Sequence, residues 1–195
     1  RIEIPASLVN TAYFYHVTCI MADVAGILDK KEDEHHLHTL AETIRKNFNA
    51  AFYNDVTHHY WEGKQGADVF ALAFGLVLEG KQEKVFSALL EHLKKVNYHF
   101  DTGILATPLL LKVLTENGRA DLAYKLMNQR DFPSYGYLAD KKNNTLWETW
   151  NGDGNDEGCG HCHPMFGSVV AWFYNSLAGI KPDLVNPGMK HFYVE

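Results

Sequence analysis

The sequence predicts an all-α protein, and three observations lead to this prediction. Apolar residues recur with the period of a helix through most of the 195 residues. Strand signals are weak, because only short runs such as YGYLAD and MKHFYVE have a pattern that could pair. Tight turns alternate with long connections rich in polar and aromatic side chains. The chain therefore falls in the all-α class rather than the α/β class.

Four helices are predicted in the N-terminal half. The first covers residues 8–29, and the second runs from Asp33, a candidate N-cap, to residue 52. The third, 67–78, is apolar on nearly all sides and should be buried, whereas the fourth, 82–97, is amphipathic. The apolar stripes of the three amphipathic helices are Leu8, Ala12, Tyr15, Cys19, Ala22 and Ala25; Leu37, Leu40, Ala41, Ile44, Phe48, Ala51 and Phe52; and Val85, Phe86, Leu89, Leu90, Leu93 and Val96.

Three further helices are predicted in the C-terminal half. One near 105–117 is mostly apolar, one near 119–129 has a polar face, and one near 164–178 is apolar. The seven predicted helices thus alternate between buried and half-exposed ones.

The connections between these helices differ in length according to their direction. Turns from a buried helix to an exposed one are short, and they cover residues 29–31, 79–81 and 117–118. The connections that return from an exposed helix to a buried one are long, and they cover residues 53–66, 97–103 and 130–163. If successive hairpins pack side by side, all the long loops share one rim, which is the pattern of an α/α toroid. A rim with many Trp, Tyr, His and carboxylate groups suits a sugar. The alternative is a helical solenoid that binds proteins.

The composition restricts the classes of partner. The hydrophobic content is 46% and the net charge is 18 minus 24, or -6, with no basic block, so binding to nucleic acid or to an anionic membrane is not expected. No apolar run reaches the roughly 20 residues that span a bilayer. The chain begins at Arg1 rather than Met and without a signal-peptide pattern, so we expect one partial domain, residues 1–195, of something longer.

Glu148 is the main catalytic candidate. It lies between Trp147 and Trp150, and apolar rings beside a carboxylate restrict its rotamers and its hydration, which prepares a general acid or base. The alternative is a surface Glu whose aromatic neighbours belong to the core. The acidic residues that follow within 153–157 lack the spacing of a calcium loop.

The segment CGHCH, residues 159–163, has the spacing of a haem attachment or of half a zinc site. No second ligand pair stands at a matching distance, because Cys19 is alone and the pairs His35–His36 and His58–His59 do not form the other half. The segment also does not open a helix after a strand, as a thioredoxin motif does. We therefore expect no metal and no cofactor.

A family resemblance rests on several long segments. TGILATPLLLKVLTENGRADLAYKLMNQRDFPSYGY, TLWETW and HPMFGSVVAWFYNSLAGIKPD follow one another in the order seen in bacterial α-L-rhamnosidases of glycoside hydrolase family 78, and VNTAYFYHVTCIMADVAGIL resembles their helix pairs. The resemblance implies the C-terminal half of an (α/α)6 catalytic barrel. It further implies a bacterial protein, cytoplasmic or periplasmic.

The resemblance also implies roles for residues. Glu148 corresponds to the family's general base, and His163 to a residue that contacts the sugar, so Cys159 and Cys162 imitate a haem motif by chance. Trp147, Trp150, Tyr135 and Trp61 are candidates to shape the sugar site or to stack on the sugar. This chain departs from the family at two positions, with Cys162 where Asn is common and Tyr135 where Trp is common.

The expected function is therefore the inverting hydrolysis of terminal α-L-rhamnose from rhamnose-containing glycosides or polysaccharides. The family's general acid lies in a segment N-terminal to everything present here, so the N-terminal half of the same catalytic domain is the expected partner. The alternatives are another α/α-barrel glycosidase or polysaccharide lyase, and a non-catalytic carbohydrate-binding helical domain.

Overall fold

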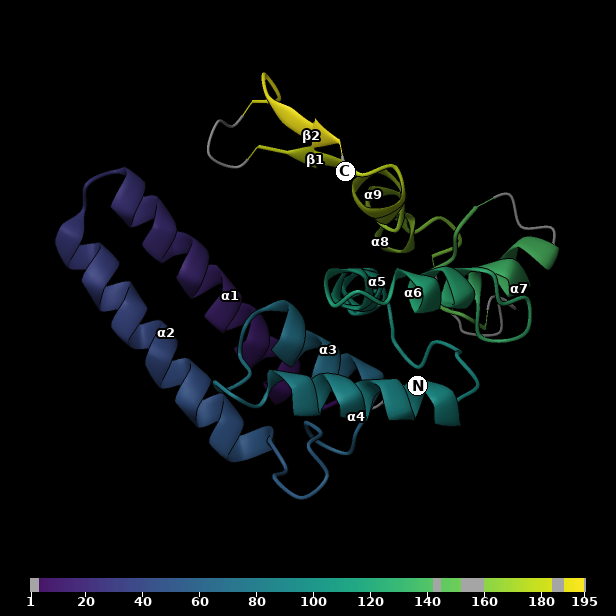
Figure 1. Cartoon of the computed structure of the whole chain (residues 1–195), viewed down its shortest axis with the longest axis horizontal. Helices are drawn as coiled ribbons and strands as arrows, with labels where there is room; N and C mark the ends of the chain where they lie inside the picture. Colours follow the sequence, from purple (N-terminus) through teal and green to yellow (C-terminus); the bar gives the residue numbers. More distant parts are fainter. Residues whose placement is uncertain (1–3, 142–144, 152–159, 184–187, 195) are drawn as a thin grey trace. The chain divides into compact units, whose positions relative to one another are not determined.

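The structure is a computed structural model, and it describes residues 4–141, 145–151, 160–183 and 188–194. The chain divides into two compact units, Arg1–Lys95 and Val96–Glu195. The elements, labelled in Figure 1, are α1 (Ala6–Ile27), α2 (Lys31–Phe52), α3 (Gln65–Ala73), α4 (Gln82–Lys95), α5 (Thr107–Glu116), α6 (Ala120–Met127), α7 (Tyr135–Asp140), α8 (Pro164–Gly167), α9 (Val170–Trp172), the π-helix η1 (Phe173–Leu177), β1 (Ile180–Pro182) and β2 (Phe192–Val194). The all-α prediction is confirmed; that of a single domain stays a prediction.

In the first unit, α1 and α2 lie side by side as one helical hairpin (Figure 1). The buried face of α1 follows the predicted stripe, except that Thr18 takes the place of Cys19. The Thr18 hydroxyl is satisfied within the helix, because it donates to the Phe14 carbonyl oxygen at 2.7 Å. Helix α2 begins at Lys31, so the prediction that Asp33 caps it is wrong. The turn after α1 is so tight that the next helix starts at once.

Two of the helix ends in the first unit share one hydrogen-bond pattern. After α3, Gly75 has a φ of 73°, and the Leu76 N–H donates to the Ala71 carbonyl at 2.9 Å, which is the Schellman arrangement. The same arrangement ends α1 with Asp29 at the left-handed position, φ 55°. Helix α3 therefore ends at Ala73, earlier than the predicted residue 78, because Gly75 offers a cheap left-handed turn.

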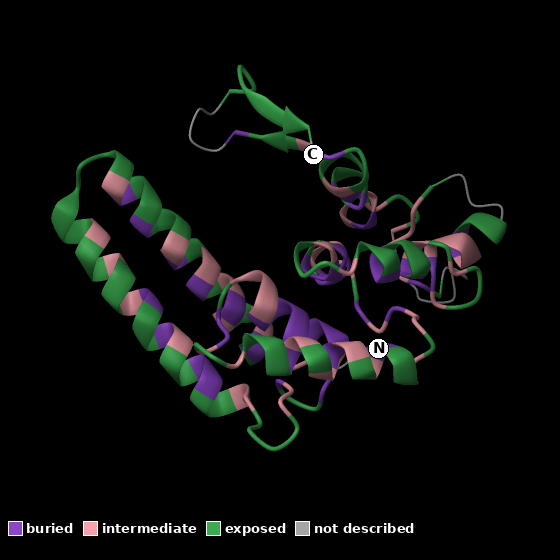
Figure 2. Cartoon of the chain, in the orientation of Figure 1, coloured by how far each residue is buried: buried purple, intermediate pink, exposed green. Residues whose placement is uncertain are grey.

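Burial of α3 matches the prediction. Every residue from Gln65 to Ala71 is buried, and α3 packs on α4 and α1 (Figure 2). Of the predicted stripe of α4, Val85, Leu89 and Leu93 are buried along one face, whereas Phe86, Leu90 and Val96 are half-buried.

In the second unit, α5 packs on α6 and on α9. The run YGYLAD, named above as a possible strand, forms helix α7 instead, because the Ser134 hydroxyl accepts the Tyr137 N–H at 2.9 Å and caps it. The other run does pair: β2 lies antiparallel to β1, with Lys181 opposite Tyr193.

The predicted helix near 164–178 is interrupted. It is divided into α8, α9 and η1, with the Ser168 N–H bonded to the Pro164 carbonyl and the Ala171 N–H to the Ser168 carbonyl. The prediction that this helix is buried is wrong for its outer face, where four large side chains are exposed: Val170, Phe173, Tyr174 and Leu177. In the part of the chain that the structure describes, no helix has the length and apolarity to cross a membrane.

Candidate functional site

Glu148 is held by a short antiparallel pairing of two segments, 145–148 and 160–163. The Glu148 N–H donates to the Gly160 carbonyl at 2.9 Å, and the His163 N–H donates to the Leu146 carbonyl at 2.8 Å. The Gly160 N–H in turn donates to Oε2 of the Glu148 side chain at 2.9 Å. This bond fixes the carboxylate in one orientation, with Glu148 only partly buried. The pairing thus presents an ordered carboxylate at a surface that solvent reaches.

Trp147, next to this carboxylate, is covered by a histidine. The imidazole of His161 lies against the indole with ring centres 4.5 Å apart and planes 24° apart. The Thr145 hydroxyl donates to the His161 carbonyl, which ties the histidine to the facing segment. Trp147 remains partly exposed and is therefore available for contact with a ligand.

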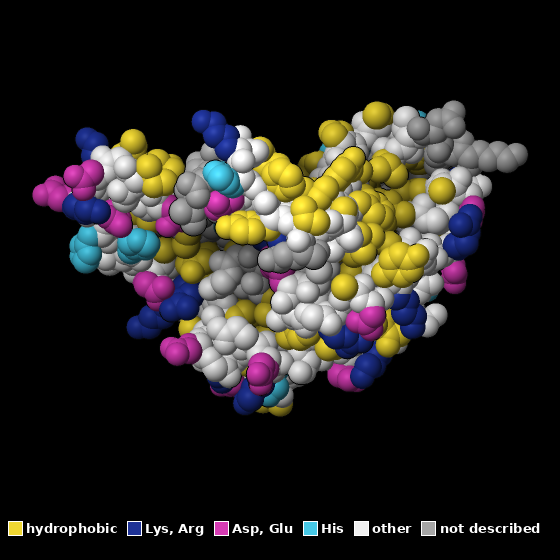
Figure 3. Space-filling view, turned by 45° about the horizontal axis from the view of Figure 1, so that its top comes forward, with side chains coloured by type: hydrophobic (Ala, Val, Ile, Leu, Met, Phe, Trp, Pro, Cys, Tyr) yellow, Lys and Arg dark blue, Asp and Glu magenta, His cyan; other side chains and the backbone are white. Residues whose placement is uncertain are grey.

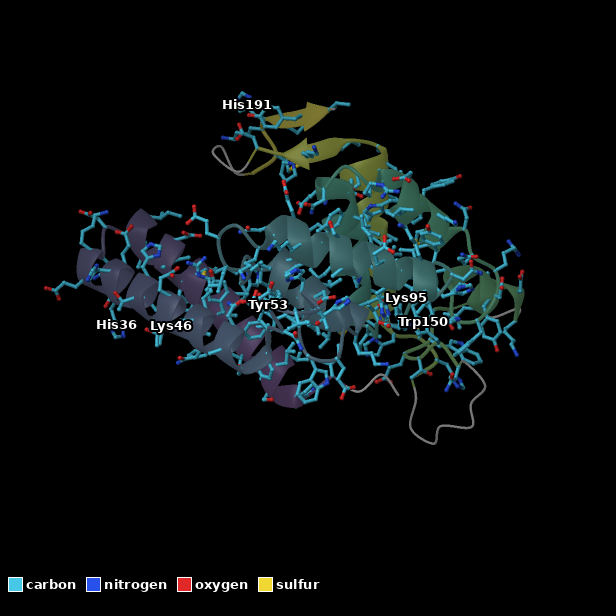
Figure 4. The ribbon with its side chains drawn as sticks, turned by 60° about the horizontal axis from the view of Figure 1, so that its bottom comes forward. His36, Lys46, Tyr53, Lys95, Trp150 and His191 are labelled. Atoms are coloured by element: carbon cyan, nitrogen blue, oxygen red, sulfur yellow. The ribbon has the colours of Figure 1, made fainter. Side chains whose placement is uncertain are left out.

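Trp150 lies in the core rather than at the surface of the site. Its side chain is 6% exposed, and its indole N–H donates to the Thr102 carbonyl at 2.7 Å. Figure 4 labels Trp150 among the side chains of its unit. The Trp150 ring stacks on the Phe100 ring with ring centres 5.1 Å apart, and its centre lies 4.3 Å from that of the Phe166 ring. Trp150 thus anchors the segment that carries Glu148, which fits a role in shaping the site and not one in stacking on a ligand.

Tyr135 belongs to the same aromatic cluster. Its ring meets that of Trp150 edge to face at 5.2 Å, and its hydroxyl donates to the Phe166 carbonyl at 3.0 Å. Burial raises the pKa of Tyr135 well above its ordinary value, so the phenol remains a neutral hydrogen-bond donor. Tyr135 therefore connects the start of α7 to α8.

His163 forms the N-cap of α8. Its Nδ1 accepts the Met165 N–H at 3.4 Å, so a neutral ring carries its proton on Nε2. An imidazole held in this way can offer Nε2 as a donor to a hydroxyl of a ligand. The backbone pairing with Leu146 places His163 on the segment that faces Glu148.

The CGHCH segment is only partly described. Cys159 lies outside the described residues, and Cys162 is an exposed, free thiol. Among the described residues, no three His, Cys, Asp or Glu side chains are grouped as a metal site would require. The expectation of no metal therefore stays a prediction for the segment as a whole.

Trp61 lies in the first unit, away in sequence from the segments around Glu148. It is 41% exposed and has a φ of 54°, an uncommon conformation for a bulky residue. Its backbone N–H donates to the Phe52 carbonyl at 2.8 Å. In the same loop, the backbones of Tyr53 and Tyr60 form an antiparallel bridge; Tyr53 is labelled in Figure 4. The structure thus describes Trp61 as an exposed aromatic ring on a well-bonded loop of the first unit.

Sequence reasoning missed two residues of the site. Gly160 orients the Glu148 carboxylate through its backbone N–H, and His161 covers Trp147. A backbone donor leaves no trace in residue type, so Gly160 carried no signal. His161 was noted only as part of the CGHCH segment, and its contact with Trp147 depends on the pairing of two segments, which the sequence did not predict.

The fold and the site define a protein of helical hairpins whose long loops carry a carboxylate among aromatic rings. The model of the bacterial alpha-L-rhamnosidase 6 hairpin glycosidase domain matches residues 3–177. An alpha-L-rhamnosidase of Formosa agariphila is 34% identical over 182 residues, which are 90% of this chain and 20% of that protein. This chain belongs to the bacterial α-L-rhamnosidase family, within its six-hairpin glycosidase domain.

Solved structures give the same result. The alpha-L-rhamnosidase of Streptomyces avermitilis, complexed with L-rhamnose, matches 92% of this chain with a TM-score of 0.85 and 35% identity, over 18% of its own chain. The alpha-L-rhamnosidase from Dictyoglumus thermophilum matches 87% with a TM-score of 0.82 and 37% identity, over 19% of its chain. The chain thus spans about a fifth of the length of the relatives it matches.

Proposed function

We propose that this chain is part of the catalytic domain of an enzyme that releases terminal α-L-rhamnose by inverting hydrolysis. The observation that carries the proposal is the Glu148 carboxylate, which is oriented by the Gly160 N–H at 2.9 Å. Membership of the family supports the substrate class, because the matched relatives are named alpha-L-rhamnosidases. Rhamnose-containing glycosides or polysaccharides are then the substrates.

In this mechanism Glu148 acts as the general base. An inverting glycosidase needs one carboxylate that activates water and one carboxylic acid that protonates the leaving oxygen, roughly 6.5 to 9.5 Å apart. The Gly160 N–H donates to Oε2 of Glu148, and the carboxylate takes the proton of the attacking water. The water oxygen attacks the anomeric carbon, and the bond to the leaving oxygen breaks as that oxygen is protonated.

The general acid is proposed to belong to the N-terminal half of the same catalytic domain. The short span of this chain relative to its relatives supports this placement. His163 would hydrogen-bond a sugar hydroxyl through Nε2, and Trp147 would stack on the sugar. Trp61 would contact the sugar or its aglycone from the first unit.

The test is Glu148→Gln in the complete protein that contains this chain. The amide keeps the shape of the side chain but cannot accept the water's proton, so kcat on a chromogenic α-L-rhamnoside should fall by about a hundredfold or more. Binding of L-rhamnose, measured by calorimetry, should be nearly unchanged. His163→Ala should instead weaken that binding.

Glu116→Gln is the matched control, because Glu116 is exposed at the end of α5. Near-normal kcat in the Glu148 variant would mean that Glu148 is structural and would overturn the proposal. An unaltered protein that releases unsaturated sugar would be a lyase, and one that binds sugar without turnover would be a binding protein; either result overturns the proposed reaction.

A further inference from the structure

The stack between Trp147 and His161 joins the two paired segments, one of which carries Glu148. Ring centres 4.5 Å apart with planes 24° apart place the imidazole over one face of the indole. The histidine itself is exposed, whereas Trp147 is partly buried. One face of Trp147 is therefore occupied by the protein.

The backbone around both rings is fixed as well. The Thr145 hydroxyl donates to the His161 carbonyl, and the neighbours on each side, Glu148 with Gly160 and Leu146 with His163, are bonded through their backbones at 2.9 and 2.8 Å. The stack thus joins two segments whose backbones are bonded to each other.

We propose that His161 is a positioning residue that makes Trp147 a one-sided stacking surface for the sugar bound beside Glu148. This inference rests on the proposed function. It assigns to Trp147 and His161 together the choice of which face of the sugar contacts the protein. A 6-deoxyhexose such as rhamnose carries a methyl group in place of one hydroxymethyl, so it offers an apolar edge to an indole. With one face covered by His161, Trp147 can receive that edge only on its other face.

The proposal predicts a particular kinetic pattern in the complete protein. Stacking acts on the bound sugar in the ground state and the transition state alike, so its loss raises KM and leaves kcat unchanged. His161→Ala should raise KM for a chromogenic α-L-rhamnoside about three- to tenfold. His161→Phe keeps a flat ring over the indole and should restore KM to within about twofold. His191→Ala, at an exposed histidine of the same unit, is the control and should change neither constant.

A second measurement reads the cover directly and without sugar. Quenching of Trp147 fluorescence by iodide, taken as the difference between each protein and its Trp147→Phe counterpart, should increase in His161→Ala and not in His161→Phe. An unchanged KM in His161→Ala, a fall in kcat alone, or a His161→Phe variant as impaired as the Ala variant would each overturn the inference. If the unaltered protein does not hydrolyse rhamnosides, the proposed function fails, and the quenching comparison still decides whether His161 covers Trp147.

Discussion

At the scale of single residues, the site combines what the sequence contained with what it could not show. The position of a carboxylate between two tryptophans made Glu148 the catalytic candidate in the sequence, because a general base needs that residue type. The division of labour between the two indoles was not readable: Trp150 is buried with its N–H on Thr102, whereas Trp147 is partly exposed under His161. The two tryptophans thus differ in burial because each contacts a different segment that is distant in the sequence, Trp150 the segment of Thr102 and Trp147 the segment of His161.

Asp68 shows a second residue-scale effect, in the first unit. Its side chain is fully buried, with Oδ1 accepting the Tyr60 N–H and Oδ2 bonded to Nδ1 of His59, both at 2.7 Å. Burial raises the pKa of Asp68 above its ordinary value, although these two hydrogen bonds lower it in part. A raised folded-state pKa means that stability is full below the ordinary pKa and is lost as pH rises through the raised one.

The unfolding temperature of Asp68→Asn relative to the unaltered protein should therefore be higher at high pH than at low pH. The amide cannot ionise, so the gain in unfolding temperature over the unaltered protein should grow with pH and level off above the raised pKa. Thermal unfolding at a series of pH values measures this difference. Asp23→Asn, at an exposed position on α1, should show no such growth. A gain that is constant across pH, or that shrinks, would contradict the assignment of burial as the main cause.

At the scale of elements, the periodic helices were predictable and the local exceptions were not. The stripes of α1 and α4 follow apolar spacing, because each helix buries one face against a neighbour. Helix α7 depends on one buried cap, Ser134, and the division of the last helix on bonds around Ser168. Hydrogen bonds of this kind compete with the helix or strand propensity of single residues, and the spacing of apolar residues does not predict them.

The turn between α1 and α2 yields a prediction about helix ends. Asp29 has a φ of 55° at the position where glycine is favoured, and it places a negative charge at the C-terminal end of α1. Asp29→Gly should therefore raise the free energy of unfolding by about 0.5–1 kcal/mol. Gly118→Ala is the reverse test at φ 73°, with no atom within 4 Å of the added carbon, and should cost about 1 kcal/mol. Urea denaturation compares both; a loss from Asp29→Gly would show that the aspartate stabilises the turn.

At the scale of the whole molecule, exposed hydrophobic side chains indicate missing neighbours. Figure 3 shows hydrophobic side chains at the surface of one face. Helix α1 exposes a series of them: Phe14, Val17, Ile20, Met21, Val24 and Ile27. Helix α3, by contrast, is covered within its own unit. The last helix also exposes large side chains, which are Val170, Phe173, Tyr174 and Leu177.

The 195-residue chain expressed alone should therefore self-associate and show no rhamnosidase activity above background. Exposed faces of this extent favour association, and a base without its acid leaves the departing oxygen unprotonated, so cleavage is slow. Adding the N-terminal half of the catalytic domain should restore both a defined size in light scattering and turnover of a chromogenic α-L-rhamnoside. A monodisperse monomer of this chain that hydrolyses the rhamnoside, and loses activity in Asp101→Asn, would place the second acid within the chain and contradict the proposed division of the two carboxyl groups. The same monomer without activity would contradict only the argument from the exposed faces of α1 and the last helix.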